Sequence, residues 1–357
     1  MSEITITRTT KPGNLPDATK LGFGHCFADH MFVMDYEKGK GWHNSSIVPY
    51  DEFCMYPSAM VLHYGQAIFE GMKAFRTKNN EITLFRPQDY LSRFNRSAEI
   101  LCIPQMDTKM VHEALKTLIQ MDKAWVPDCF GTSLYIRPFV VATDPYVGVK
   151  VSDTYKLYII LSPSGAYYAK GFDPVSIKVE DKFVRAVHGG LGEAKTPANY
   201  AASLKAQVEA QKEGFTQVLW LDAVERKYIE EVGTMNIFFK INGELITPAL
   251  NGSILGGITR RTVLELARHW GVKATERAIS IDEVYEANAK GQLEEVFGSG
   301  TAAVISPVGE LSWKGQKIVI NNNQTGPFAQ KLFDYVTGLQ YGKVEDTFGW
   351  VETVAKL

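Results

Sequence analysis

The sequence has few cysteines, and they lack the spacing of a disulfide framework or a zinc site. The chain of 357 residues has four cysteines, none of which forms a Cys-x-x-Cys pair: Cys26, Cys54, Cys102 and Cys129. None of the seven histidines belongs to a His-Glu-x-x-His pattern. We therefore expect reduced, packed thiols and no metal site built by the protein.

Long apolar runs and an excess of one charge are also lacking. The longest apolar segments, such as "KLYIILSP", are far too short to span a bilayer, and residues 1–20 are polar without an apolar signal core. The formal net charge is only -2, and both signs are interspersed without a basic stripe. We expect a cytoplasmic protein that binds small molecules rather than nucleic acid or membrane.

The chain nevertheless has ample material for a large core, because 45% of its residues are hydrophobic. Strand-like and helix-like segments intermix without strict β-α-β alternation, which indicates a mixed α/β fold rather than a plain doubly wound sheet. A connector with Gly and Pro at residues 169–176 predicts two domains. These are a smaller N-terminal α/β domain at residues 1–168 and a larger C-terminal domain at residues 177–357.

Local patterns predict several elements. Residues 30–50 resemble two strands about a glycine-rich turn, and residues 64–87 a short helix followed by a hairpin at Asn79 and Asn80. Apolar spacing predicts helices within residues 89–104 and 111–126, and another from Pro197 to about Glu213.

The stretch "HGGLGEAKTPANYAASL", residues 188–204, places a lysine among glycines just before a helix start. Two chemistries use such a lysine. A P-loop binds phosphate through Gly, four residues and Gly-Lys-Ser/Thr, which Gly189 to Thr196 nearly matches. Alternatively, the amine of Lys195 forms a Schiff base with an aldehyde cofactor or a carbonyl substrate.

The P-loop interpretation is the weaker of the two. A glycine should precede the lysine so that backbone amides can surround the phosphates, and this position is Ala194. Asp222, at the end of "VLWLD", could hold magnesium, although apolar strands that end in Asp mostly lead into a turn. Thr196 and Pro197 are typical N-cap and first-turn residues, so Lys195 lies just outside the helix.

Other segments supply groups that a pyridoxal phosphate site needs. Glu231 belongs to an acidic pair that leads into a Gly-Thr turn and then an apolar strand, and its carboxylate could meet a pyridine nitrogen. Ile258 and Thr259 begin an amphipathic helix whose free N–H groups favour an anion. Each signal alone is also compatible with a solvated carboxylate or a capped surface helix.

Seven segments in order closely resemble the branched-chain-amino-acid aminotransferases, which are fold-type IV pyridoxal phosphate enzymes. The resemblance covers residues 21–340 and includes the following segments: "LHYGQAIFEGMKAFR", "RPQDYLSRFNRSAEILCIP", "LYIRPFVVATDPYVGV", "GGLGEAKTPANYAASL", "EEVGTMNIFF", "ILGGITRRTVLELA" and "VFGSGTAAVISPV". It implies the fold-type IV architecture with pyridoxal 5'-phosphate as the cofactor.

The resemblance also implies roles for individual residues. Lys195 resembles the Schiff-base lysine, and Tyr200 and Glu231 match the partners of the phenolic oxygen and the pyridine nitrogen. The remaining cofactor positions are Arg93, Thr234, Ile258, Thr259 and Thr301, most of which face the phosphate. The substrate positions are Tyr64, Tyr135, Arg137, Thr301 and Ala302, with Phe23 and Tyr167 lining the aliphatic pocket.

The reaction that the resemblance implies is ping-pong transamination between Leu, Ile or Val and 2-oxoglutarate, in a homodimer. Three alternatives remain open. D-amino-acid aminotransferases and aminodeoxychorismate lyase share the lysine and the glutamate, a P-loop nucleotide-binding protein belongs to another class, and a cofactor carrier would bind without catalysis. The sequence does not rank Leu, Ile and Val, because one methylene in an apolar pocket changes binding by only about 1–3 kcal/mol.

Overall fold

The structure is a computed structural model that describes residues 4–165 and 172–357. The chain divides into two compact units, neither of which is a continuous piece of sequence. The first unit comprises Met1–Tyr167, Ala194–Pro197 and Gly338–Leu357. The second unit comprises Tyr168–Glu193 and Ala198–Thr337. Lys195 therefore belongs to the first unit, within the short segment Ala194–Pro197, although the segments on both sides of it belong to the second unit.

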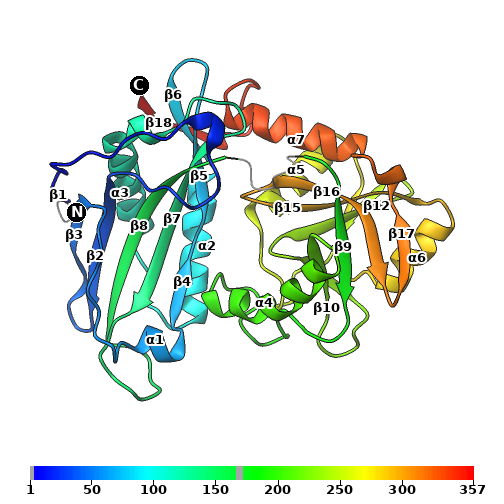
Figure 1. The fold of residues 1–357 in the computed structure, drawn as a ribbon, viewed down its shortest axis with the longest axis horizontal. Coiled ribbons are helices and arrows are strands. Elements are labelled where there is room, and N and C mark those ends of the chain that lie inside the picture. Colours follow the sequence, from blue (N-terminus) through cyan, green and yellow to red (C-terminus); the bar gives the residue numbers. More distant parts are fainter. Residues whose placement is uncertain (1–3, 166–171) are drawn as a thin grey trace. The chain divides into compact units, whose positions relative to one another are not determined.

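The first unit contains one mixed sheet (Figure 1), with strand order β1-β3-β2-β8-β7-β5-β6-β18 and β4 paired to β7. Most pairs are antiparallel, whereas β1 lies parallel to β3. The strands are β1 (Thr5–Ile6), β2 (His30–Glu37), β3 (Gly41–Pro49), β4 (Ala67–Phe69), β5 (Met72–Arg76), β6 (Glu81–Phe85), β7 (Ser133–Ala142), β8 (Thr154–Ser164) and β18 (Val351–Lys356). The C-terminal strand β18 returns to the edge of this sheet, next to β6.

Two amphipathic helices of the first unit, α2 (Pro87–Ile100) and α3 (Thr108–Met121), pack on each other and on strands of the sheet. Asp107 begins α3 by accepting the backbone N–H of Lys109 at 2.9 Å. The short helix α1 (Met60–Tyr64) ends at Gly65, whose φ of 64° is left-handed. The predicted helix beginning at Tyr64 was therefore wrong, because the chain turns there and continues as strands β4 and β5.

The second unit contains a second mixed sheet, ordered β11-β10-β9-β16-β15-β12-β13-β14 with β17 paired to β16. Its strands are β9 (Val175–Glu180), β10 (Gln217–Leu221), β11 (Ile229–Val232), β12 (Asn236–Ile241), β13 (Glu244–Thr247), β14 (Ala274–Glu276), β15 (Leu293–Gly300), β16 (Val304–Trp313) and β17 (Gln316–Val319). Its helices are α4 (Pro197–Lys212), α5 (Ile258–His269), α6 (Ile281–Ala289) and α7 (Pro327–Gln340), of which α4 begins and α7 ends in the first unit. The predicted start of α4 at Pro197 is confirmed.

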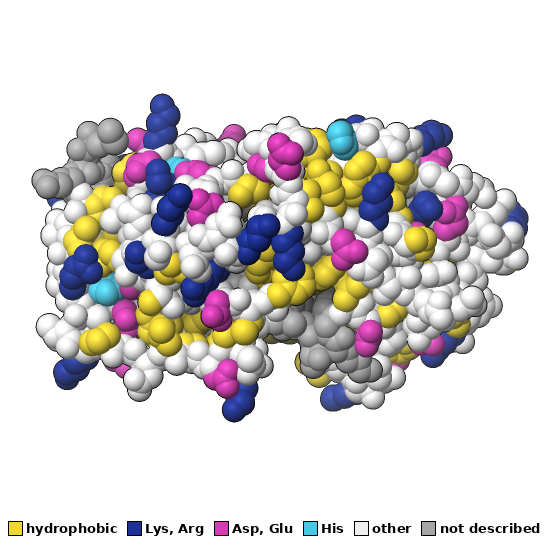
Figure 2. All heavy atoms as spheres, turned by 90° about the horizontal axis from the view of Figure 1, so that it is seen from above, with side chains coloured by type: hydrophobic (Ala, Val, Ile, Leu, Met, Phe, Trp, Pro, Cys, Tyr) yellow, Lys and Arg dark blue, Asp and Glu magenta, His cyan; other side chains and the backbone are white. Residues whose placement is uncertain are grey.

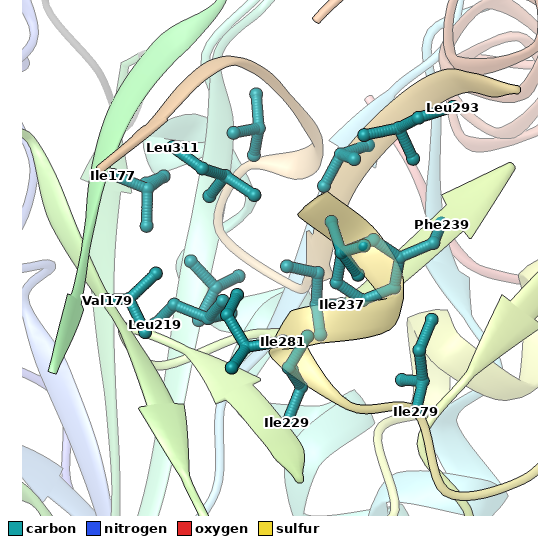
Figure 3. Packing of buried hydrophobic residues seen from close by; sticks show 14 of the residues in the cluster. Ile177, Val179, Leu219, Ile229, Ile237, Phe239, Ile279, Ile281, Leu293 and Leu311 are labelled. Atoms are coloured by element: carbon teal, nitrogen blue, oxygen red, sulfur yellow. The ribbon is translucent and has the colours of Figure 1, made fainter. Parts of the chain in front are cut away.

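The core of the second unit is formed by aliphatic side chains of its strands and of α6. Figure 3 shows Ile177, Val179 and Leu219 pointing toward side chains from β11, β12 and α6. Burial of these apolar side chains is the main force that holds the sheet against the helix. The rigid strands in turn fix the loops at their ends, where the candidate site residues lie.

On the face drawn in Figure 2, Lys and Arg side chains are interspersed with Asp and Glu side chains. None of the helices formed by residues 4–165 and 172–357 is long and apolar enough to cross a membrane. The expected mixed α/β fold is confirmed, with its strands and helices distributed over two sheets.

Candidate active site

Lys195 is held by its backbone in the first unit. Its N–H donates to Ser97 Oγ at 2.9 Å, and its carbonyl accepts the N–H of Phe69 at 3.0 Å. The neighbouring Thr196 hydroxyl donates to the Ala67 carbonyl at 2.9 Å. These bonds join the lysine to α2 and β4, so its amine is presented from a rigid base.

Phe69 is a site residue that the sequence did not reveal. The Lys195 Nζ lies 4.9 Å from the centroid of its ring, and the Arg137 Cζ lies 4.8 Å from the same centroid. Two cations thus contact one aromatic ring, a favourable arrangement that also limits where they can move. A phenylalanine in an apolar strand resembles ordinary core, and no local pattern distinguishes it.

Three predicted substrate residues lie together in the first unit. The Tyr135 hydroxyl accepts a hydrogen bond from Arg137 Nη2 at 3.2 Å. The rings of Phe23 and Tyr135 pack edge to face, with their centroids 5.0 Å apart. A Cβ at Gly71 would lie 1.9 Å from the Tyr135 hydroxyl, so only glycine fits there. Among the described residues no acceptor bonds the buried Nε of Arg137. This N–H suits a carboxylate ligand.

Arg93, a predicted phosphate residue, forms a two-bond ion pair with Glu70. Its Nε and Nη2 lie 2.7 and 2.9 Å from the two carboxylate oxygens of Glu70, which is 0% exposed. The backbone N–H of Gly71 also donates to this carboxylate at 3.0 Å. Glu70 thereby fixes the plane of the Arg93 guanidinium, a role that sequence reasoning missed.

Two predicted substrate residues are not part of this cluster. Tyr64 ends α1 with 40% of its side chain exposed, and its ring packs on His63. Tyr167 lies outside the described residues.

Glu231 lies in β11 of the second unit, where it is 2% exposed and ionically paired. Its Oε2 lies 2.8 Å from Arg185 Nε, and its Oε1 accepts the N–H of Leu255 at 2.8 Å and the Asn236 amide at 3.3 Å. A buried carboxylate that accepts bonds from a guanidinium and a backbone N–H is stabilised in its charged form. Arg185 is a further candidate site residue that the sequence did not indicate, because a lone arginine before a glycine-rich stretch has no distinctive signature.

A small pocket of the second unit brings together three of the predicted cofactor residues. Its lining consists of Arg185, Asn199, Tyr200, Ser203, Glu231, Gly233, Thr234 and Leu255. Tyr200 projects from the first turn and a half of α4, and Thr234 from the turn between β11 and β12. Tyr200 and Glu231 therefore line one cavity.

The remaining predicted cofactor residues lie on two turns of the second unit. Ile258 and Thr259 begin α5, whose N-cap Gly257 provides no side-chain cap. A Cβ at Gly257 would lie 2.0 Å from Asn236 Oδ1, so the amides of this first turn stay close to β12. Thr301 and Ala302 form the turn between β15 and β16, after which Val304 has a left-handed φ of 62°, a strained value for a β-branched residue.

The residues present fit pyridoxal phosphate. A primary amine, a hydroxyl that shares a cavity with an ionised carboxylate, and a helix N-terminus without a side-chain cap are the groups that its aldehyde, phenolic oxygen, ring nitrogen and phosphate require. The amine belongs to the first unit and the carboxylate to the second.

The features that favoured a P-loop have structural roles instead. The two carboxylate oxygens of Asp222 accept backbone N–H groups of the following turn, from residues 224 to 228, at 2.7–3.0 Å. Asp222 is therefore a turn anchor. Gly192 is needed because a Cβ there would lie 2.1 Å from the Ser253 carbonyl oxygen. In the part of the chain that the structure describes, no group of three or more His, Cys, Asp or Glu side chains is arranged to hold a metal.

Similarity to known proteins decides the family. Residues 67–311 match the family model for amino-transferase class IV. The chain is 58% identical to branched-chain-amino-acid aminotransferase 2 of Bacillus subtilis (strain 168), over 99% of this chain and 97% of that protein. The chain belongs to the branched-chain-amino-acid aminotransferases.

Solved structures of other branched-chain aminotransferases have the same fold. The Escherichia coli enzyme superimposes with a TM-score of 0.77 at 27% identity, over 92% of this chain and 99% of that one. The enzyme of the thermophilic archaeon Thermoproteus uzoniensis, solved with norvaline, gives a TM-score of 0.75 at 27% identity, over 91% of this chain and 100% of that one. The family resemblance and the fold-type IV architecture expected from the sequence are confirmed.

Proposed function

We propose that this branched-chain aminotransferase transfers the amino group of leucine, isoleucine or valine to 2-oxoglutarate, giving a branched-chain 2-oxo acid and L-glutamate. One observation carries the proposal from the geometry. Lys195 and Arg137 contact the same Phe69 ring, so an amine that takes an aldehyde lies near a guanidinium that takes a carboxylate. Amino acids and 2-oxo acids carry a carboxylate next to the reacting carbon.

The cofactor that suits this site is pyridoxal 5'-phosphate, with Lys195 holding its aldehyde carbon. The other residues that we propose to hold it are Tyr200 at the phenolic oxygen, Glu231 at the ring nitrogen, and Arg93, Ile258, Thr259 and Thr301 around the phosphate. Thr234 is a further proposed cofactor residue. When bound, the cofactor supplies a positively charged ring that withdraws electrons from the substrate α-carbon.

Within this chain, Lys195 Nζ is the group that moves protons. It would remove the α-proton of the amino acid in one half-reaction and return a proton to the α-carbon in the other. Its backbone bonds to Ser97 and Phe69 hold it in place for both transfers. Glu231, ionised beside Arg185, would hold a proton at the ring nitrogen and so preserve the positive charge of the ring.

The substrate groups of the first unit divide into polar and apolar parts. Arg137 and Tyr135 would bind a carboxylate. The family resemblance adds the backbone of Thr301 and Ala302, which belong to the second unit. Phe23 and Phe69 would contact the branched side chain and exclude water from it. Tyr64 and Tyr167 are further candidates for this pocket, for which the family resemblance is the support.

We also propose a homodimer and a cytoplasmic location. The family resemblance supports the dimer, and the balanced composition supports the location.

The proposed function is tested by replacing Lys195 with alanine. The variant should lose transamination of leucine, because it lacks the amine that holds the cofactor and moves the proton. Lys205, exposed on α4 and paired with Glu209, is the matched control, and Lys205→Ala should retain activity. Transamination by Lys195→Ala near the level of the unsubstituted enzyme would refute the assignment.

A further inference from the structure

Glu230 is a buried carboxyl group for which the reaction has no direct use. It precedes Glu231 in β11 and is 4% exposed. Its Oε1 contacts the hydroxyl of Ser253 closely, and its Oε2 is buried with no hydrogen-bond partner among the described residues. An ionised carboxylate with one unbonded oxygen in such a place would be costly. An uncharged carboxylic acid would leave only a carbonyl oxygen unbonded.

The contacts of Ser253 indicate where the protons are. Its Oγ lies 2.7 Å from Asn251 Oδ1 as well as close to Glu230 Oε1. Asn251 Oδ1 also accepts the backbone N–H of Ser253 at 3.0 Å, which identifies this amide atom as the oxygen. The hydroxyl has one proton to donate. If that proton goes to Asn251, the proton between Ser253 and Glu230 must come from Glu230.

The charges around Glu230 agree with this proton count. Arg185 is the nearby cation, and it is already paired with Glu231 at 2.8 Å. Burial has the largest effect and raises the pKa of Glu230, and Asp222 adds to that effect, while the Ser253 hydroxyl, Arg185 and the Asn251 side chain act against it. With Glu230 neutral, one guanidinium balances one carboxylate in this buried cluster.

Ser253 connects Glu230 to the cofactor residues. Its carbonyl accepts a bond from Arg185 Nη1 at 2.9 Å and packs against Gly192, where no side chain would fit. Two residues later, the N–H of Leu255 donates to Glu231 at 2.8 Å. The loop from Asn251 to Gly257 therefore bonds to both members of the Arg185–Glu231 pair and leads into α5. A displacement of Ser253 would therefore also displace the groups that bind Glu231.

We propose that Glu230 is an uncharged positioning residue, whose hydroxyl proton holds Ser253 so that the Asn251–Gly257 loop keeps Arg185 and Glu231 aligned with the cofactor ring nitrogen. The role at the ring nitrogen rests on the proposed function. The uncharged state of Glu230 and its bond to Ser253 do not.

The protonation state of Glu230 is tested by infrared difference spectroscopy on the protein without cofactor. The spectrum of the unsubstituted protein minus that of Glu230→Gln at about pH 7.5 should contain the C=O band of a carboxylic acid. A difference that contains only carboxylate bands would overturn the proposal. This result is independent of any enzyme activity.

The positioning role is tested with pyridoxal phosphate itself. Glu230→Ala removes the donor to Ser253, and should weaken cofactor binding about tenfold, the effect of losing one buried hydrogen bond. It should also shift the pH midpoint of the visible absorption of the holoenzyme. Glu230→Gln keeps a neutral donor and should restore both quantities to within about twofold, or about 0.3 pH units, of the unsubstituted protein.

A second variant tests whether misfolding explains the effect of Glu230→Ala. Ser253→Ala keeps the backbone carbonyl that Arg185 uses but loses the hydroxyl, and it should reproduce the weaker binding and the shifted midpoint of Glu230→Ala. If both alanine variants bind the cofactor and titrate as the unsubstituted protein does, Glu230 has no positioning role. If the unsubstituted enzyme binds the cofactor but does not transaminate leucine, the proposed function fails while these comparisons stand.

Discussion

Arg185 and Glu231 form a buried ion pair in the second unit, with Arg185 Nε 2.8 Å from Glu231 Oε2. The pair is also bound by backbone groups, since Arg185 donates to the Ser253 carbonyl and Glu231 accepts the Leu255 N–H. Removing one partner of such a pair leaves an uncompensated charge away from water, which costs more than the pair itself contributes. The proposed cofactor residue Glu231 therefore depends on Arg185 for its charge balance.

Arg185→Gln should lower the free energy of unfolding by about 3 kcal/mol, because it leaves Glu231 buried without its cation. Urea unfolding followed by circular dichroism measures the change. The control is Arg261→Gln, which removes a surface pair with Glu265 and should change stability by less than about 0.5 kcal/mol. Equal losses in the two variants would contradict the importance of the buried pair.

Phe69→Leu should lower kcat/KM for leucine by about tenfold, since it removes the ring that Lys195 and Arg137 both contact while keeping an apolar side chain. Steady-state kinetics with leucine and 2-oxoglutarate measure the effect. Phe53→Leu, at an exposed position of the first unit, is the control and should leave kcat/KM within about twofold. An unchanged kcat/KM in Phe69→Leu would show that the aromatic ring has no role at the site.

Arg137→Leu should raise the KM for 2-oxoglutarate by about 10–100-fold, the range expected for one charge-assisted hydrogen bond. The KM for leucine should rise by a similar factor, because both substrates carry a carboxylate next to the reacting carbon. Separate measurement of the two half-reactions gives the effect on each substrate. A loss confined to 2-oxoglutarate would show that Arg137 binds the carboxylate that leucine lacks.

Asp222 makes the stability of the second unit depend on pH. Although burial acts in the other direction, backbone N–H groups of residues 224–228 lower the pKa of Asp222 below its ordinary value of 3.8. A lowered carboxyl pKa gives stability that is present above pH 3.8 and is lost as the pH falls through the lowered value. Asp222→Asn should therefore cost about 1–2 kcal/mol at about pH 7 and progressively less as the pH falls below 3.8. A cost independent of pH would show that the charge is not what stabilises the turn.

Sequence patterns predicted correctly those features that neighbouring residues determine, such as a helix start and a turn. Pro197 starts α4, and the segment before β3 turns at glycines, as predicted. Residues 295–307 belong to two strands, β15 and β16, because the chain turns at Thr301 to Ala303. A pattern of alternating apolar residues does not show where an antiparallel strand reverses.

Sequence patterns did not predict contacts between residues that are far apart in the chain. Nothing local indicates that β18 closes the sheet beside β6, or that Glu70 will hold Arg93, 23 residues later in the chain. Arg185 and Glu231 are likewise brought together by the fold of β9 to β11. These contacts depend on tertiary packing, whereas the lysine, tyrosine and glutamate of the site could be named from segments that resemble a family.

The most direct test of the account is the visible absorption of the holoenzyme before and after addition of leucine and then 2-oxoglutarate, with borohydride reduction and peptide mapping of a parallel sample. We predict a visible absorption band of the cofactor that leucine removes and 2-oxoglutarate restores. After reduction, the cofactor should be attached to Lys195. A band that does not respond to leucine, or a label on another residue, would contradict it.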